Sequence, residues 1–191
     1  MSTDDPIAFM LTWSTYGTWL PGDARGWVEY RRGFQLPDPI LEIECAARMT
    51  EDACRLVPHQ RERVHKQVAE TCAHKEWLLH AVNCRTNHVH VLLSSSAHPK
   101  IIREQLKAWC TRRLNEQLAA LGIAERERRS KWWSERGSIR WIFRESDLAA
   151  AIDYVLNQQD NPDRFIKSRT ADAAAPGIAG CRSRIRVEGP R

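Results

Sequence analysis

The sequence lacks several features that mark common classes of protein. Its first residues have neither the basic start nor the apolar run of a signal peptide. No stretch approaches the roughly 18 apolar residues that a membrane span needs. The six cysteines include no Cys-x-x-Cys pair, which argues against a paired-cysteine zinc site and, without a secretory signal, against a disulfide framework. We therefore expect a cytoplasmic protein with free thiols and no membrane partner.

Length and composition are those of an ordinary soluble domain. The chain has 191 residues, of which 42% are hydrophobic and 28% charged. The net charge of +5 favours a polyanionic partner only mildly, because 24 acidic residues are interspersed with 29 basic ones. Eight tryptophans against three tyrosines is an unusual balance, and it supplies both core volume and stacking faces.

Hydrophobic patterning predicts four strands alternating with helices. The strands are expected at 7–13, 76–84, 88–93 and 139–143, and the helices at 58–74, 99–121 and 146–159. Thr50 with its acidic neighbours also looks like a helix start. The order β-α-β-β-α-β-α predicts an α+β fold, with a four-stranded antiparallel sheet of the ferredoxin-like, split β-α-β kind.

We expect a single domain over residues 1–167. Residues 14–27 are rich in Gly, Pro and aromatic side chains and predict a structured loop, part of an insertion at about 14–34. Residues 168–191 form an Ala-, Gly-, Pro- and Arg-rich stretch without periodicity, which predicts a disordered basic tail.

His88 and His90 are two apart in an expected strand, so both imidazoles lie on one face of the sheet. Two neutral imidazoles at this separation can hold one divalent cation, with a third ligand from elsewhere. The alternative is a pair of partly buried histidines that only make hydrogen bonds. Two known His-x-His chemistries do not fit, because position 92 is Leu92 and no His-x-Thr or His-x-Ser repeat is present.

The last expected helix carries Tyr154 and Gln158, four residues apart. At about 100° per residue the two lie together at the rim of the apolar face formed by Leu148, Ile152 and Val155. A phenolate can attack phosphorus, and an amide oxygen can bind a hard cation. By itself a tyrosine on a helix flank is more often a packing residue, so this pair gains weight only together with the histidines.

Together these motifs resemble the IS200-like transposases, single-tyrosine members of the HUH endonuclease superfamily that include the REP-associated tyrosine transposases. The resemblance rests on Asn87–Leu92 (NHVHVL) and Tyr154–Gln158 (YVLNQ), and it covers roughly residues 7–160. It implies that Tyr154 is the nucleophile and that His88, His90 and Gln158 bind Mg²⁺ or Mn²⁺. The aromatic loop at 14–27 is longer than a minimal transposase of this kind needs.

The resemblance implies a metal-dependent single-strand DNA endonuclease and strand transferase, which forms a 5′-phosphotyrosine intermediate on hairpin-associated DNA. It is compatible with a homodimer as well as with a monomer. Basic side chains would hold phosphates and aromatic rings would stack on unpaired bases. The candidate DNA contacts are Tyr16, Trp19, Arg103, Lys107, Arg112, Arg113, Lys131, Trp132 and Trp133.

Each of these contacts could instead be a solvated helix residue or a core tryptophan, and Trp77, Trp109 and Trp141 are expected in the core. Two other functions remain open at this stage. One is a catalytically silent DNA-binding relative, and the other is a metal-dependent phosphodiesterase in which activated water attacks and Tyr154 is structural.

Overall fold

A computed structural model describes residues 5–29, 32–158 and 185–187. Its main sheet contains β1 (Ala8–Ser14), β4 (Leu78–Cys84), β5 (His88–Ser94), β6 (Ser138–Ile142) and β7 (Ile185–Val187). The strand order is β4-β5-β1-β6-β7, and every neighbouring pair is antiparallel. The first four strands confirm the predicted ferredoxin-like sheet. The fifth strand, β7, is short and pairs with β6. Residues 159–167 and most of the predicted tail lie outside the described residues.

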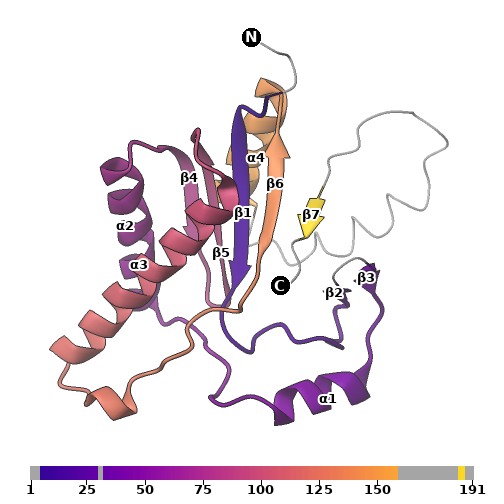
Figure 1. Ribbon diagram of the computed structural model, residues 1–191, viewed down its shortest axis with the longest axis vertical. Helices are drawn as coiled ribbons and strands as arrows, with labels where there is room; N and C mark the ends of the chain where they lie inside the picture. Colours follow the sequence, from indigo (N-terminus) through magenta and orange to yellow (C-terminus); the bar gives the residue numbers. More distant parts are fainter. Residues whose placement is uncertain (1–4, 30–31, 159–184, 188–191) are drawn as a thin grey trace.

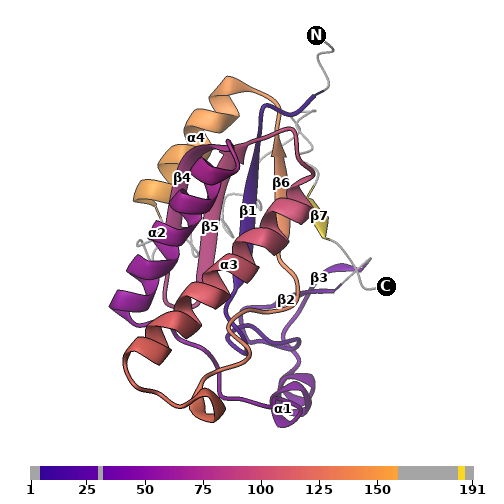
Figure 2. The same cartoon turned by 60° about the vertical axis from the view of Figure 1, so that its left-hand side comes forward.

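Helices cover both faces of this sheet. On one face lie α2 (Pro58–His74), which connects β1 to β4, and α3 (Pro99–Ala120), which connects β5 to β6. The closing helix α4 (Glu145–Asn157) lies on the other face (Figures 1 and 2). None of the described helices is long and apolar enough to cross a membrane.

The alternation of side chains along the strands creates two separate hydrophobic clusters. The larger lies under α2 and α3 and includes Leu11, Val91 and Ile139, which are aligned across three strands. The smaller lies under α4 and includes Ala8 and Ile142, which pair across β1 and β6, and Leu92, which pairs with Met10 on β1. Residues one position apart in the strands therefore belong to opposite layers, as a period of two requires.

Helix α3 buries one apolar stripe against the sheet. Ile102, Leu106, Cys110 and Leu114 are buried in the larger cluster, because they recur at helical spacing and face the sheet. The helix begins with Pro99, whose fixed φ and missing N–H suit a first turn. The expectation of a core position for Trp109 was wrong, since this side chain is 41% exposed.

Between β1 and α2 the chain makes an excursion, residues 15–57, that is longer and more regular than the predicted insertion. It contains the hairpin β2 (Trp27–Glu29) with β3 (Gly33–Gln35), followed by α1 (Pro39–Ala47). The Asp38 carboxylate caps α1 by accepting from the Leu41 N–H. The sequence did not predict this helix because its apolar residues Ile40 and Ile43 are exposed and form no buried stripe.

The predicted helix start at Thr50 was wrong. The main-chain N–H of Thr50 donates to the Tyr16 hydroxyl at 3.1 Å. The Glu51 carboxylate accepts from the N–H groups of Ser130 and Lys131, a segment distant in the chain. The Thr50 N–H is thus used within the excursion, and the Glu51 carboxylate joins the excursion to the segment before β6 instead of beginning a helix.

Candidate active site

His88 and His90 lie side by side on the face of the sheet that α4 covers. Their ring centroids are 4.7 Å apart, with an interplanar angle of 80°. His90 is only 6% exposed, and Val89 and Val91 on the opposite face are fully buried in the larger core. The local chain geometry follows from the strand alone, since a β-strand projects every second side chain to the same side.

Tyr154 meets this histidine pair from α4. Its ring centroid is 5.8 Å from that of His90, and the side chain is 37% exposed. The helix is held on the sheet by Leu148, Ala151 and Val155, which are buried in the smaller cluster. The phenol therefore lies at the edge of the packed layer, next to the imidazoles and open to a large substrate.

A hydrogen bond clamps the C-terminal half of α4 to the sheet. The Asn83 amide on β4 donates to the main-chain carbonyl of Val155 at 2.7 Å. Asn83 pairs with His90 across the two strands and shares its face. The carbonyls of a last helical turn lack intrahelical partners, so this contact both satisfies such a group and fixes the turn that carries Tyr154.

Each imidazole is also held through its Nδ1 atom. His88 Nδ1 lies 2.8 Å from the Asn87 side-chain oxygen, and His90 Nδ1 lies 2.7 Å from the Thr12 hydroxyl. Thr12 is on β1 directly opposite His90, whereas Asn87 immediately precedes β5. These contacts orient the two rings.

Gln158 lies at the C-cap of α4, one turn beyond Tyr154, and its N–H donates to the Tyr154 carbonyl at 3.3 Å. Its side-chain amide donates to the Asp153 carboxylate on the outer side of the helix. The role of Gln158 as a third metal ligand therefore stays a prediction. The ligating atom would be the amide oxygen, whereas the amide nitrogen is the atom that donates to Asp153.

The donor set fits a divalent cation with open coordination positions. Among the described residues, no three His, Cys, Asp or Glu side chains gather in a way that could hold a metal ion. A cation here would thus be held by the two imidazoles and completed by oxygens from Gln158, solvent or substrate. Such a mixed nitrogen and oxygen set, which is incomplete without substrate, is typical of catalytic rather than structural metal sites.

Comparison with protein families shows to which family the chain belongs. Residues 49–158, more than half of the chain, match the family described as "Transposase IS200 like". The chain belongs to the IS200-like transposase family. The matched segment runs through α2, β4, β5, α3, β6 and α4 and thus includes both histidines, Tyr154 and Gln158. No curated protein matches the chain.

Two of the predicted DNA contacts, Arg103 and Lys107, lie on α3 and are used inside the protein. Arg103 is 3% exposed and donates to the carbonyl of Gly137. Lys107 donates through Nζ to the carbonyls of Ser134 and Arg136 at 2.7 and 2.9 Å, and burial lowers its pKa to about 8. Both side chains hold the segment that leads into β6, on the face opposite to the histidines.

Trp132 and Trp133 also belong to the packed interior. Trp132 is 3% exposed and donates from Nε1 to the Asn115 side chain, whereas Trp133 donates to Thr111 and packs against the core. A ring that is covered on both faces cannot stack on a base, so the expectation for Trp132 does not fit this structure.

Arg112 and Arg113 are engaged with acidic side chains on the outer surface. Arg112 pairs with Glu116 and lies over the Trp109 ring, while Arg113 pairs with Glu116 and Glu70. These ion pairs contribute little to stability because they are exposed. Like Arg103 and Lys107, they lie on the helix that covers the face away from Tyr154.

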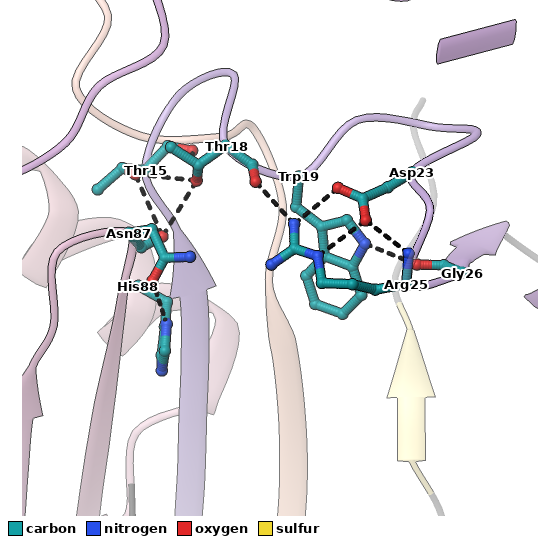
Figure 3. A network of polar contacts seen from close by, with 8 residues as sticks. All are labelled: Thr15, Thr18, Trp19, Asp23, Arg25, Gly26, Asn87 and His88. Carbon is teal, nitrogen blue, oxygen red and sulfur yellow. Dashed lines mark hydrogen bonds and ion pairs between the residues drawn. The ribbon is translucent and has the colours of Figure 1, made fainter. Parts of the chain in front are cut away.

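The remaining candidates are Tyr16 and Trp19 in the aromatic loop and Lys131 before β6, and this loop begins at the end of β1 that pairs with His88. Trp19 is 48% exposed, donates to the Gly26 carbonyl and has the Arg25 guanidinium 5.6 Å from its ring (Figure 3). Lys131 lies 5.3 Å from the Tyr16 ring. The hydrogen bond from Thr50 lowers the pKa of Tyr16.

Three polar residues of the site were given no role from the sequence: Thr12, Asn83 and Asn87. Thr12 and Asn83 are polar positions within otherwise apolar strands, and that signal could have marked them. Asn87 was visible as the residue before the histidine pair. Their partners could not be predicted, because the Thr12–His90 and Asn83–Val155 contacts join residues 78 and 72 positions apart.

Proposed function

We propose that this protein is a metal-dependent single-strand DNA endonuclease and strand transferase that acts through a tyrosine-linked intermediate. One observation carries the proposal: the Tyr154 ring lies 5.8 Å from His90, whose ring in turn lies 4.7 Å from His88. This arrangement brings a candidate nucleophile, the phenol, next to two imidazoles that could bind a cation, at an exposed edge of the packed layer. All three residues come from one chain, so a homodimer is not required to assemble them.

His88 and His90, with Gln158 as the proposed third ligand, would hold Mg²⁺ or Mn²⁺. Bound there, the cation supplies Lewis-acid polarisation of a phosphate oxygen and offsets the charge that develops on it. Imidazole suits transition metals better than it suits Mg²⁺, so we expect Mn²⁺ to bind more tightly.

Tyr154 performs the bond exchange. Its phenolic oxygen forms a bond to the scissile phosphorus while the bond from phosphorus to the 3′ oxygen breaks. The phenol loses its proton and the departing 3′ oxygen gains one. The product is a 5′-phosphotyrosine link with a free 3′-hydroxyl on the other fragment. Strand transfer reverses this exchange with a different 3′-hydroxyl and needs no further energy source, because the phosphodiester energy is kept in the covalent link.

Single-stranded or hairpin DNA would approach the rim where Tyr154 is exposed. We propose Trp19, Tyr16 and Lys131 as contacts at this end of the sheet, because the exposed ring of Trp19 can stack on a base and Lys131 is a surface cation.

The decisive experiment is covalent capture. Labelled single strands with varied hairpins, incubated with the protein and Mn²⁺, should give a complex that survives denaturation. Mass spectrometry should find the nucleotide on the tryptic peptide of residues 145–164, which contains Tyr154. Tyr154→Phe and His88→Ala should abolish the complex, whereas His74→Ala, an exposed histidine at the end of α2, should keep it.

Two outcomes would overturn the proposal in favour of the alternatives. Binding of DNA without any adduct across all substrates would indicate a catalytically silent DNA-binding protein. Strand cleavage that persists in Tyr154→Phe but is lost in His88→Ala would indicate a phosphodiesterase that uses activated water.

A further inference from the structure

Asn87 is held unusually firmly for a residue in a connection between two strands. Its main-chain carbonyl accepts from the Thr15 N–H at 2.8 Å, the Thr15 hydroxyl at 3.1 Å and the Thr18 hydroxyl at 3.2 Å (Figure 3). Thr15 is fully buried. The backbone at Asn87 is therefore fixed by the start of the aromatic loop, independently of what its side chain does.

The side chain of Asn87 extends from this fixed point to the neighbouring histidine. Its oxygen lies 2.8 Å from His88 Nδ1 (Figure 3). An amide oxygen can only accept, so Nδ1 must carry the proton. In the neutral imidazole, the lone pair then belongs to Nε2.

Thr12 makes the corresponding contact to the second ring. Its hydroxyl lies 2.7 Å from His90 Nδ1, across the β1–β5 pairing. His90 is 6% exposed, so a ring nitrogen at this depth needs a partner. A hydroxyl can accept from Nδ1–H and thereby also leave the lone pair on Nε2.

We infer that Asn87 and Thr12 are positioning residues that hold His88 and His90 in the tautomer with Nδ1 protonated and Nε2 as the ligating atom. The inference rests on the proposed function insofar as the ligand is a divalent cation. It also gives the aromatic loop a role beyond DNA contact. Thr15 and Thr18 fix the Asn87 backbone, and through it the orientation of one metal-binding ring.

The energetic consequence is a tighter cation site. A ring that is already in the ligating tautomer and orientation does not have to be rearranged when the cation binds. Loss of such an outer contact usually weakens metal affinity by about 10- to 100-fold. Asn87→Leu removes the acceptor at nearly constant volume, and Thr12→Val removes the hydroxyl at nearly constant shape. Asn87→Asp and Thr12→Ser are the matched variants that keep an acceptor.

The first measurement is made on the full chain without metal. Nitrogen-15 correlation spectra of the histidine rings should show His88 and His90 with protonated Nδ1. Asn87→Leu should shift His88 toward the Nε2-protonated form, and Thr12→Val should do so for His90. The conservative variants should restore the wild-type tautomer. Unchanged tautomers in both Asn87→Leu and Thr12→Val would overturn the inference.

The second measurement is Mn²⁺ affinity by electron paramagnetic resonance. We expect a loss of about 10- to 100-fold in Asn87→Leu and Thr12→Val, with recovery in the conservative variants. Equal affinity in all variants would overturn the inference. If the wild-type protein bound no Mn²⁺ at all, the proposed metal-dependent function would be wrong. The inference about the tautomers would still be decided by the NMR measurement, which is made without metal. If Asn87→Leu did not fold, Asn87→Ala removes the same acceptor with a smaller side chain.

Discussion

Thr12 and Asn83 are partly buried polar side chains on the face that α4 covers, and each pairs with His90 across neighbouring strands. Each has a hydrogen-bond partner, because an unsatisfied polar group in such a place costs about 1–3 kcal/mol. The two partners are the His90 ring and the last turn of α4. At the scale of the residue, the site is thus built by hydrogen bonds that cross from strand to strand and from strand to helix.

Removal of the Asn83 amide should loosen the helix that carries Tyr154. In Asn83→Ala the Val155 carbonyl loses its donor, so we expect the free energy of unfolding to fall by about 1–2 kcal/mol, measured by urea denaturation. Formation of the covalent adduct should also slow.

Asn157→Ala is the matched control for this change. Asn157 lies on the same helix, but it is exposed and its amide donates only to Asp153. We expect a change within about 0.5 kcal/mol. An equal loss of stability in the two variants would contradict a specific clamp at Asn83.

Four regular elements were predicted closely from the sequence, namely β5, α2, α3 and α4. Their boundaries follow from a strong apolar pattern and from prolines at the first turns of α2 and α3. The excursion between β1 and α2 was predicted poorly. Its helix α1 buries none of its residues, so the sequence has no apolar periodicity that would predict a helix there. The hairpin before it consists of two strands of three residues each, which are too short to give a pattern.

Within the excursion, the loop of residues 15–26 depends on polar contacts and close backbone approaches. Asp23 forms an ion pair with Arg25 at 2.6 Å, and Arg25 also donates to the Thr18 carbonyl (Figure 3). Gly22 has a φ of 90°, and a Cβ there would lie 2.3 Å from the Asp38 carbonyl oxygen. This turn is therefore restricted to glycine by both its conformation and its space.

The Asp23–Arg25 pair predicts a pH dependence of this loop. The hydrogen bond from Arg25 holds the pKa of Asp23 below its usual value. Stability from a carboxyl group with a lowered pKa is present above the usual value near 3.9 and is lost as the pH falls through the folded-state pKa. In Asp23→Asn, residues 15–26 should therefore exchange backbone hydrogens faster than in the wild type at pH 7.

At a pH low enough to have passed through the folded-state pKa of Asp23, this difference between Asp23→Asn and the wild type should diminish, because the wild-type carboxyl group becomes protonated. Asp52→Asn, which changes an exposed carboxyl group at the other end of the excursion, should leave the exchange of residues 15–26 unchanged. A difference of the same size at both pH values would contradict this account.

In the whole molecule, the candidate active site and most of the hydrophobic core lie on opposite faces of one sheet. The larger cluster under α2 and α3 does not involve the histidines, whereas Tyr154 and His90 adjoin the smaller cluster under α4. Helix α3, which carries Arg103, Lys107, Arg112 and Arg113, covers the face away from the histidines. Net charge therefore says little about where DNA binds, and the end of the sheet with the aromatic loop is the better candidate.

This separation predicts that metal removal abolishes activity without unfolding the protein. With EDTA, adduct formation should cease while the circular dichroism spectrum stays unchanged. Mn²⁺ should raise the Tm, since binding at about 100 times Kd adds about 2.7 kcal/mol to the folded state. His88→Ala should lose most of this rise and His74→Ala should keep it. Unfolding of the protein by EDTA, or an equal rise in Tm for His88→Ala and the wild type, would contradict the separation of the metal site from the hydrophobic core.

The sequence by itself determined the local features of this protein. Strand periodicity put His88 and His90 on one face, helix periodicity put Tyr154 at the rim of the apolar face of the last helix, and the order of elements gave the ferredoxin-like sheet. These features depend on residues a few positions apart, whose relative placement is set by the period of the backbone.

Only the tertiary structure decided which elements meet. It brought Tyr154 to His90, gave each imidazole its Nδ1 partner, and put Arg103, Lys107 and Trp132 into the interior. These contacts depend on strand register and on which face each helix covers. Those choices are made by the burial of the whole apolar surface at once, and no local pattern contains them.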